Sequence, residues 1–249
     1  MSVESIAPVP AEGPGDGMLH YRDAESGHTF LIGPPQASPA LWRQCMDGAL
    51  EVYRHYSSED ALEYDAVVDG LSTTLFAVAL DREQKVVAGV RAEGPHRHVD
   101  EVHAVSSWRG MAGDAAFRRL VAEQIPDGVI ECKAGWTARD TGNRSALADW
   151  VARAIVHCAT LLGVRYAVGV APEHALKCYR SSGANVAWWI PPTSYPDDRY
   201  RTVPVWWDLH TYHTVATEPQ ARLIEIELAE LVAEGTTLPD EWSRDEGLA

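Results

Sequence analysis

The segment 135–150, GWTARDTGNRSALADW, places charged and small polar residues directly before an apolar-periodic stretch. It brings Arg139, Gly142, Asn143 and Arg144 to the point where a strand gives way to a helix. The start of a helix exposes backbone N–H groups without partners, and the positive end of the helix dipole lies behind them. A loop of this kind is therefore a ready site for a phosphate group.

The side chains of this loop leave two interpretations open. Arg139 and Arg144 would add charge-assisted hydrogen bonds to an anion, and the hydroxyls of Thr137, Thr141 and Ser145 would add neutral ones. The asparagine before the helix fits a second interpretation, because asparagine is a good N-terminal cap and needs no ligand. The residues alone favour an anion site and a simple helix start about equally.

Three histidines lie close together upstream, at His96, His98 and His103, with carboxylates at Asp100 and Glu101. These side chains are of the types that hold metal ions, and the first two histidines would share one face of a strand. A Gly-Pro pair directly precedes them, and a solvated turn explains the same residues. We expect no metal site here.

Two tryptophan pairs could shape an apolar pocket. Trp188 and Trp189 lie in AWWI, and Trp206 and Trp207 lie in VWWD. Such pairs are typical of a sheet core and a sheet edge, and the alternative is that they line a ligand pocket. The four cysteines are scattered without a Cys-x-x-Cys pair, which favours reduced thiols in a cytoplasmic protein over a disulfide frame or a zinc site.

Composition excludes several classes of protein. The 249 residues are 46% hydrophobic and 23% charged, which is ordinary for a globular chain. The formal net charge of −15 argues against nucleic-acid binding, because phosphate backbones need a basic face. No apolar run approaches the roughly 20 residues that span a bilayer, and the N-terminus has neither the basic start nor the apolar core of a signal peptide. We expect a cytoplasmic protein without a membrane or nucleic-acid partner.

The elements that position these residues follow from periodicity and turn signals. Apolar spacing predicts helices over 41–56 and 114–124, and β-rich runs at 73–80 and 85–93 predict an antiparallel hairpin. An extended piece at 98–105 and a strand at 128–136 are also expected. A long helix follows the quoted loop and ends at Gly163, where glycine is a common terminator.

The rest of the chain continues the alternation of strands and helices. We expect a strand at 164–171, a short helix at 173–181, two strands at 184–190 and 201–209, and a last amphipathic helix. This order predicts one mixed α/β domain. Its parts are a flexible N-terminal arm over 1–40 with one short strand or turn, a domain over 41–215, and a C-terminal helix with an acidic tail over 216–249.

The hairpin, the Arg-x-x-Gly loop, the long helix and the segment YRSSGA together resemble the GNAT acyltransferases. In that family the loop pattern Arg-x-x-Gly-x-Gly/Ala binds the pyrophosphate of acyl-CoA. Arg139 and Gly142 match it, and Arg144 stands where Gly or Ala is usual. Tyr179 and Gly183 match the short helix whose tyrosine faces the thioester. The resemblance implies a mixed central sheet flanked by helices, with two splayed strands and the acyl-pantetheine in the gap.

One branch of the superfamily is a closer match. VVAGVRAEGP, a helix and then VIECKAGW resemble the autoinducer synthases and N-acyl-amino-acid synthases. Gly89, Arg91 and Glu131 lie close to that branch's pattern. The segment 133–135 reads Lys-Ala-Gly where Ser-Arg-Phe is usual, so homoserine-lactone synthesis is not implied. Our candidates for substrate binding are Arg91, Trp188 and Trp189. The resemblance covers residues 41–208.

The chemistry implied by this resemblance needs a base for the amine, a donor for the oxyanion and an acid for the thiolate. Glu131 is the candidate base, directly or through water, and Glu101 is the second candidate. Tyr179 is the candidate acid, and a backbone N–H near Trp136 would meet the oxyanion. Structural interpretations stay open, since Glu131 could simply pair with Lys133 and a tyrosine on a short helix is often a packing residue.

The resemblance thus implies an N-acyltransferase that uses acetyl-CoA, a longer acyl-CoA or an acyl carrier protein, and no metal. The acceptor would be a small-molecule amine, and the acidic composition favours a cationic one. An acyl-CoA-binding module without turnover and a metal-dependent hydrolase stay open as alternatives, as does a homodimer. The residues expected to contact the donor are Trp136, Thr137, Arg139, Thr141, Gly142, Asn143, Arg144 and Ser145.

Overall fold

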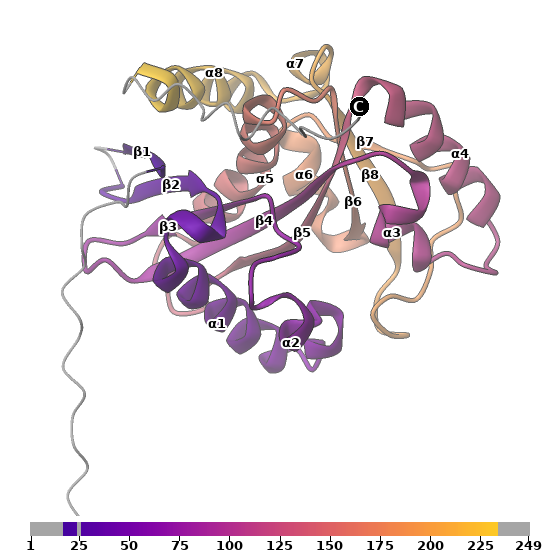
Figure 1. Ribbon diagram of the computed structural model, residues 1–249, viewed down its shortest axis with the longest axis horizontal. Coiled ribbons are helices and arrows are strands. Elements are labelled where there is room, and N and C mark those ends of the chain that lie inside the picture. Colours follow the sequence, from indigo (N-terminus) through magenta and orange to yellow (C-terminus); the bar gives the residue numbers. More distant parts are fainter. Residues whose placement is uncertain (1–16, 24–25, 234–249) are drawn as a thin grey trace, which may run out of the picture.

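The computed structural model describes residues 17–23 and 26–233. A mixed sheet of eight strands crosses the molecule in the order β1-β2-β3-β4-β5-β6-β8-β7, and helices cover it (Figure 1). The strands are β1 Leu19–Arg22, β2 Thr29–Gly33, β3 Leu75–Leu80, β4 Val86–His96, β5 Val129–Thr137, β6 Tyr166–Pro172, β7 Asn185–Val186 and β8 Thr202–Asp208.

Helices lie on both faces of this sheet, with α1 and α5 on opposite sides of the central strands (Figure 1). The α-helices are α1 Pro39–His55, α2 Tyr64–Val67, α3 His103–Ser106, α4 Asp114–Gln124, α5 Arg144–Leu161, α6 Leu176–Ser181, α7 Tyr212–Val215 and α8 Glu218–Ala233. The predicted fold class, a mixed sheet flanked by helices, is confirmed.

The predicted hairpin is present as β3 and β4, which pair antiparallel from Leu75↔Ala92 to Leu80↔Val86. Every residue of β3 is buried, because α1 and α5 pack against the two faces of this part of the sheet. The helix α5 is buried along most of its length, and small side chains such as Ala154 and Ala159 let it lie close to the strands. It ends before Gly163, whose φ of +63° suits a glycine after a helix.

The centre of the sheet is split between β5 and β6. These parallel strands pair at three positions only, from Val129↔Tyr166 to Glu131↔Val168. Beyond them, β5 continues along β4 as far as Thr137, whereas β6 continues along β8 as far as Pro172. The two strands therefore separate after Glu131, and the predicted pair of splayed strands is present.

The segment 98–105 does not form the predicted extended piece. It folds into a 3₁₀ helix, Val99–Glu101, followed by α3. Two carboxylates explain the difference, because each accepts backbone N–H groups at a helix start: Glu101 from Arg97 and His98, and Glu131 from the first residues of α3. The bonds to Glu131, which lies 27 or 28 residues further along the chain, cannot be read from the segment itself.

Two further boundaries differ from the sequence prediction. Only Asn185–Val186 of the predicted strand 184–190 is extended, and the chain then turns, with Ile190 N–H bonded to Ala187 O. Residues 19–33 form β1 and β2 at the edge of the sheet, where the prediction was a flexible arm with one short strand or turn near 28–32. The edge is held by Phe30 stacked on Trp150 of α5. The arm is therefore shorter than predicted, and its residues 1–16 lie outside the described residues.

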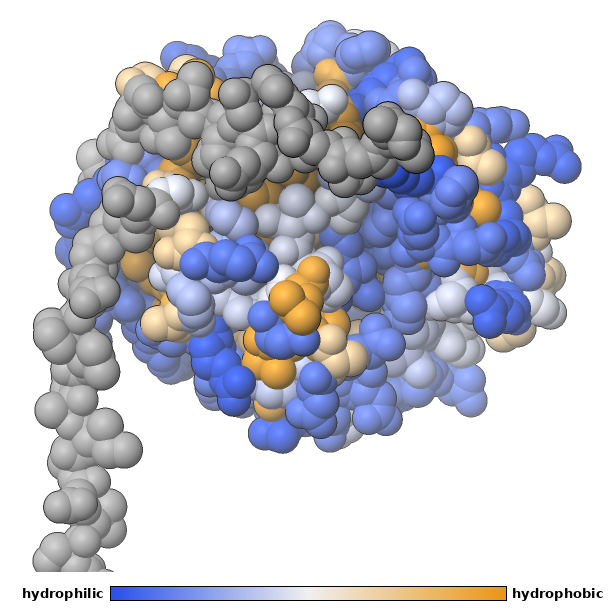
Figure 2. All heavy atoms as spheres, in the orientation of Figure 1, coloured by the Kyte–Doolittle hydropathy of each residue, from blue (hydrophilic) through white to orange (hydrophobic). Residues whose placement is uncertain are grey.

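The predicted C-terminal helix is present as α8, which packs against β1 and α5. The acidic tail, 234–249, lies outside the described residues. Hydrophilic side chains predominate on the face shown in Figure 2, as the net charge of −15 leads one to expect. No helix in the described part of the chain is long and apolar enough to cross a membrane.

Candidate active site

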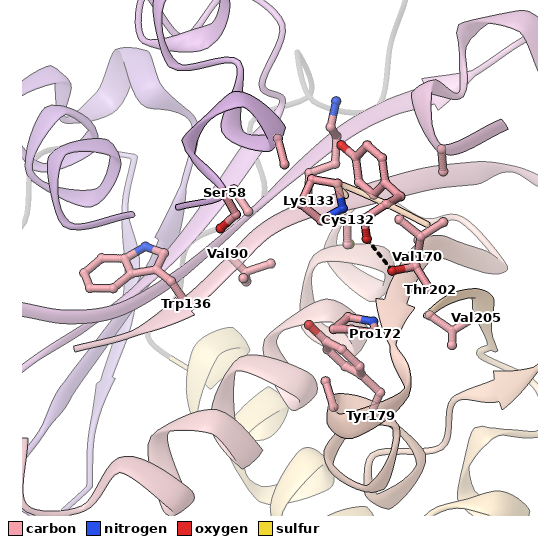
Figure 3. Close-up of a pocket in the computed structure, with 18 of the residues that line it drawn as sticks. Ser58, Val90, Cys132, Lys133, Trp136, Val170, Pro172, Tyr179, Thr202 and Val205 are labelled. Carbon is pink, nitrogen blue, oxygen red and sulfur yellow. Dashed lines mark hydrogen bonds between the residues drawn. The ribbon is translucent and has the colours of Figure 1, made fainter. Parts of the chain in front are cut away.

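A cavity of about 680 Å³ lies in the gap between the splayed strands (Figure 3). One wall is β5, and the other is β6 with β8 and the short helix α6. The end of α1 and the turn-rich segment before β8 close the third side. Its polar and aromatic lining includes Tyr53, Tyr56, His103, Glu131, Lys133, Thr137, Arg144, Tyr179, Tyr195 and Trp207. The gap implied by the sequence resemblance is thus an open space with polar groups along its wall.

A β-bulge interrupts β5 at the middle of this wall. Gly89↔Trp136 and Arg91↔Lys133 are paired across β4 and β5, so two β5 residues lie opposite one β4 residue. Ala134, inside the bulge, has a φ of +52°, which a residue with a side chain rarely adopts. The bulge takes backbone N–H groups out of the ladder beside the cavity, where they can meet an oxyanion.

Tyr179 projects from α6 into the cavity (Figure 3). A Cβ atom on Gly135 would lie 3.3 Å from the Tyr179 hydroxyl, so the hydroxyl lies directly beside the bulge. Its ring packs edge-on against Trp207, and burial raises the pKa of Tyr179 above its usual value. Among the described residues, the hydroxyl has no hydrogen-bond partner. It is therefore protonated at neutral pH and free to donate to a leaving group.

Glu131 lines the cavity at the point where β5 and β6 part, and it is only 2% exposed. Its carboxylate accepts N–H groups of His103 (2.7 Å) and Ala104 (2.8 Å). Burial raises the pKa of Glu131 to about 7, although Lys133 and the two backbone bonds act in the opposite direction. A carboxylate with this pKa can act as a base near neutral pH, and it also holds the start of α3 in place.

The second candidate base is not at the cavity. Glu101 is exposed on its 3₁₀ helix, where hydrogen bonds from the backbone of Arg97 and His98 lower its pKa. The sequence placed it on a strand beside Glu131. The helical fold of this segment carries it away from Tyr179, so the structure does not bring the two together.

Of the residues predicted to contact the donor, three line the cavity: Trp136, Thr137 and Arg144. Arg144 is the first residue of α5 and donates from Nε to Thr137 Oγ1 (3.3 Å) and from Nη2 to the Tyr56 hydroxyl (3.1 Å). Asn143 is the N-cap residue, but its side chain makes no capping bond. The Asn143 side chain therefore leaves the backbone N–H groups in the first turn of α5 uncapped.

The other loop residues lie at the surface. Arg139, Gly142 and Ser145 are exposed, as is Asn143, whereas Thr141 is half-buried. Nothing lies within 4 Å of a Cβ built on Gly142, so this part of the loop is open to solvent. Trp136, by contrast, is buried at the cavity wall, and its indole packs closely on Gly48 of α1.

The three residues predicted to bind substrate do not line the cavity. Arg91 is buried, forms an ion pair with Glu93 and donates to Thr73 Oγ1 (3.2 Å). Trp188 and Trp189 are 62% and 61% exposed, because the chain turns instead of continuing as a strand. Of the four paired tryptophans, Trp207 alone lines the cavity.

The histidines of the predicted metal alternative have separate partners. His96 Nδ1 lies 3.8 Å from Glu101, and His103 Nε2 lies 3.5 Å from Glu63. Within the described ranges, no group of three or more His, Cys, Asp or Glu side chains is placed to hold a metal ion. The four cysteines are free.

The sequence prediction missed four residues that line or support the cavity. Tyr53 comes from α1, Tyr195 and Tyr200 come from the turn-rich segment before β8, and Glu63 precedes α2. Glu63 pairs with Lys133 (3.5 Å) across the cavity wall. Two tyrosines in a turn-rich segment of ten residues were the available signal, but nothing in the sequence linked them to β5.

Comparison with known proteins places the chain in a family. No family model matches it. Over 203 residues it is 39% identical to Uncharacterized protein Rv1356c of Mycobacterium tuberculosis and to Uncharacterized protein Mb1391c of Mycobacterium bovis. The match covers 82% of this chain and 77% of each relative. The chain belongs to the family of these mycobacterial proteins.

Two solved structures are similar to this chain in fold. FeeM, an N-acyl amino acid synthase from uncultured soil microbes, matches with a TM-score of 0.59 at 10% identity, over 78% of this chain and 96% of that chain. The AHL synthase LasI matches with a TM-score of 0.51 at 13% identity, over 77% of this chain and 98% of that chain. These likenesses confirm the GNAT-like fold predicted from the sequence.

Proposed function

We propose that this protein is an N-acyltransferase that moves an acyl group from a thioester to a small-molecule amine. The observation that carries the proposal is the cavity between β5 and β6, with the Tyr179 hydroxyl, the β5 bulge and the Glu131 carboxylate along it. The N-acyl amino acid synthase activity named for FeeM is compatible with this reaction.

The reaction that these groups support is direct transfer. Glu131 takes one proton from the acceptor ammonium, directly or through water, and the neutral amine attacks the thioester carbon. Backbone N–H groups at the bulge stabilise the tetrahedral oxyanion. The C–S bond then breaks, Tyr179 gives its proton to the thiolate, and the nitrogen loses a second proton, which restores the tyrosine. The products are an amide, a thiol and one proton released to solvent.

The donor is a thioester with a phosphopantetheine arm, either acetyl-CoA or a longer acyl-CoA, or an acyl carrier protein. The uncapped start of α5 and the guanidinium of Arg144 support phosphate binding at the mouth of the cavity. Arg139, Thr141, Gly142, Asn143 and Ser145 of the same loop would contribute exposed N–H groups and hydroxyls.

Thiol release tests the reaction. Acyl-CoA thioesters of increasing length, with and without an amine library, should release thiol only when an amine is present, with one amide formed per thiol. Mass spectrometry of the product checks that one amide forms for each thiol released. Thiol release without amide formation would contradict an acyltransferase and indicate a hydrolase.

Calorimetry tests the donor. Arg139→Ala should weaken CoA binding by about 1.5–3 kcal/mol, the range for a hydrogen bond to a charged group. If CoA binds equally well after the change, the assignment of this loop is wrong. If CoA does not bind to the unchanged protein, an acyl carrier protein loaded with the same acyl group is the donor to be tried next.

One rival function has an observation in its favour. Both oxygens of the Glu131 carboxylate already accept backbone N–H groups, as they would in a module that binds acyl-CoA without turnover. Such a module would bind the donor in calorimetry and release no thiol with any amine.

A further inference from the structure

The cavity wall around Glu131 carries a chain of paired charges. Lys133 Nζ lies 3.5 Å from Glu63 Oε2 and 3.8 Å from Glu93 Oε2. Glu93 also pairs with Arg91, which is buried beneath the wall. Both cations in this part of the site thus have a carboxylate partner before any substrate enters.

The balance of charge on this wall is negative. Arg91 and Lys133 contribute two positive charges, and Glu63, Glu93 and ionised Glu131 contribute three negative ones. His103, which faces the same space and also contacts Glu63, adds little charge because burial lowers its pKa. A ligand carboxylate here would be desolvated without a free cation, whereas a ligand ammonium would meet an unbalanced carboxylate.

Arg144, which does line the cavity, lies too far from Glu131 to change this balance. In the described part of the chain, Lys133 and Arg144 are the lysine and arginine that line the cavity. Arg144 is anchored to Thr137, six residues along β5 from Glu131. At 3.2–3.4 Å per residue this separation is at most about 20 Å, somewhat less because of the bulge, so Arg144 serves the donor's phosphate end.

Aromatic rings complete the space beside Glu131. Tyr195 lines the same cavity as Glu131. Burial and then the charges of Glu63 and Glu131 raise its pKa. Tyr53 of α1 is half-buried, lies near Tyr195 and lines the same cavity. Tyrosine rings pack against apolar groups, and their faces attract cations. This half of the cavity therefore suits a cationic head on an apolar body.

We propose that the acceptor is a primary amine with an apolar, ring-bearing body and no carboxylate, so that the cavity selects an arylalkylamine over the amino acid with the same side chain. This inference rests on the proposed acyltransferase function. The ammonium lies toward Glu131, which takes its proton before attack, and the body packs against Tyr53 and Tyr195. Amine and thioester then yield amide, thiol and one proton, as above.

Matched substrate pairs test the inference. With one saturating acyl donor, thiol release is measured for tyramine against tyrosine and for phenethylamine against phenylalanine. The amine of each pair should have a kcat/KM at least tenfold higher than that of the amino acid. Equal values, or a preference for the amino acid, would overturn the proposed acceptor class while leaving the acyltransferase function intact.

A binding measurement keeps the two proposals separable. If no amine or amino acid releases thiol, the acyltransferase function fails, and calorimetry with tyramine and tyrosine still decides the acceptor class. Binding of tyramine at least tenfold tighter than that of tyrosine supports the charge argument. Equal or tighter binding of tyrosine overturns it.

Charge variants locate the selectivity. Glu63→Gln removes one partner of Lys133, which then becomes available to a carboxylate, so the ratio of kcat/KM for tyramine over tyrosine should fall at least tenfold. The double variant Glu63→Gln with Lys133→Gln should regain the preference for tyramine. Glu123→Gln, an exposed change on α4 outside the cavity, is the matched control and should leave the ratio unaltered. An unaltered ratio in Glu63→Gln would overturn the role of this wall.

Discussion

Tyr179 has a hydroxyl beside the β5 bulge and no hydrogen-bond partner among the described residues. We expect Tyr179→Phe to lower kcat by ~10²–10⁴-fold, the usual contribution of a general acid. Donor binding in calorimetry should be nearly unchanged, because the ring and its packing on Trp207 remain. Tyr64→Phe removes a hydroxyl that bonds Asp47 on the surface and is the control. Full activity of Tyr179→Phe would remove the tyrosine from the mechanism.

Glu131 sets the expected pH dependence. Its pKa is raised by burial to about 7, and a base must be deprotonated to act. The rate should therefore rise with pH through about 7, and Glu131→Gln should lower kcat by ~10²–10⁴-fold and remove this acidic limb. The acidic limb is measured in pH–rate profiles of kcat/KM for the unchanged protein and for Glu131→Gln. A limb that persists in Glu131→Gln belongs to another group, and His103 is the nearest candidate.

The same shift makes a prediction about the fold. Because the pKa of Glu131 is higher in the folded protein than its ordinary value of 4.5, folding takes up a proton between these values. Its contribution to the free energy of unfolding is fully present below pH 4.5 and is lost as the pH rises through about 7. Glu131→Gln cannot titrate, so its free energy of unfolding should fall less than that of the unchanged protein between pH 5 and pH 8 in urea titrations.

Among single residues, the sequence predicted two members of the candidate site, Glu131 and Tyr179. It missed three others for one common reason. Glu131 and Tyr179 lie in segments with recognisable patterns, a strand before a loop and a short helix before a glycine. Glu63, Tyr53 and Tyr195 come from a turn, a helix end and a loop, and only tertiary packing brings them to β5. Arg91 is a substrate candidate through the family resemblance alone, and its buried ion pair with Glu93 depends on the fold.

At the scale of elements, α8 is attached to α5 by a buried ion cluster. Glu227 accepts from Arg153 Nε (2.9 Å) and Nη2 (2.7 Å) and bonds His157 Nε2 (2.8 Å). Glu227→Ala leaves the buried Arg153 without its counter-charge, and we expect the free energy of unfolding to fall by about 3–5 kcal/mol. Chemical denaturation measures it. Glu225→Ala, exposed on the same helix, should cost far less; equal losses would show that helix propensity, not the ion cluster, dominates.

Arg144 joins α5 to α1 at the mouth of the cavity. If the start of α5 binds the donor's phosphates, Arg144→Ala should weaken CoA binding in calorimetry by about 1.5–3 kcal/mol, as for the loss of a hydrogen bond to a charged group. Arg222→Ala, exposed on α8, removes the same charge elsewhere and is the control. Tighter binding by Arg144→Ala would show instead that this arginine crowds a loop position where Gly or Ala is usual.

Most elements could be predicted because their signals are local. The hairpin and α5 follow from residue periodicity, which neighbouring residues set. The errors at 98–105 and 184–190 have non-local causes. The Glu131 carboxylate of β5 caps the first segment, and β8 pairs with only two residues of the second. The strand β2 coincides with the short strand or turn expected near residues 28–32, whereas β1 is not predicted because it is short and lies in a segment rich in Pro and Gly.

At the scale of the whole molecule, the sheet consists of two parts joined by three β5–β6 residue pairs, with the cavity between them. A ligand that binds only the folded protein stabilises it, by about 2.7 kcal/mol at 100 times its Kd. For a chain of this size, each kcal/mol raises the Tm by roughly 2–4 °C. We therefore expect the acyl donor at that excess to raise the Tm by roughly 5–10 °C in thermal-shift measurements.

A variant that fills the gap is the matched control for this shift. Val170→Trp, on β6 at the cavity wall, should retain the fold and lose most of the increase in Tm, because the indole occupies the space that the pantetheine arm needs. An increase with a loaded acyl carrier protein but not with CoA would identify the carrier protein as the donor. An increase that survives Val170→Trp would show that the donor binds elsewhere on the molecule, and the gap between β5 and β6 would then need another ligand.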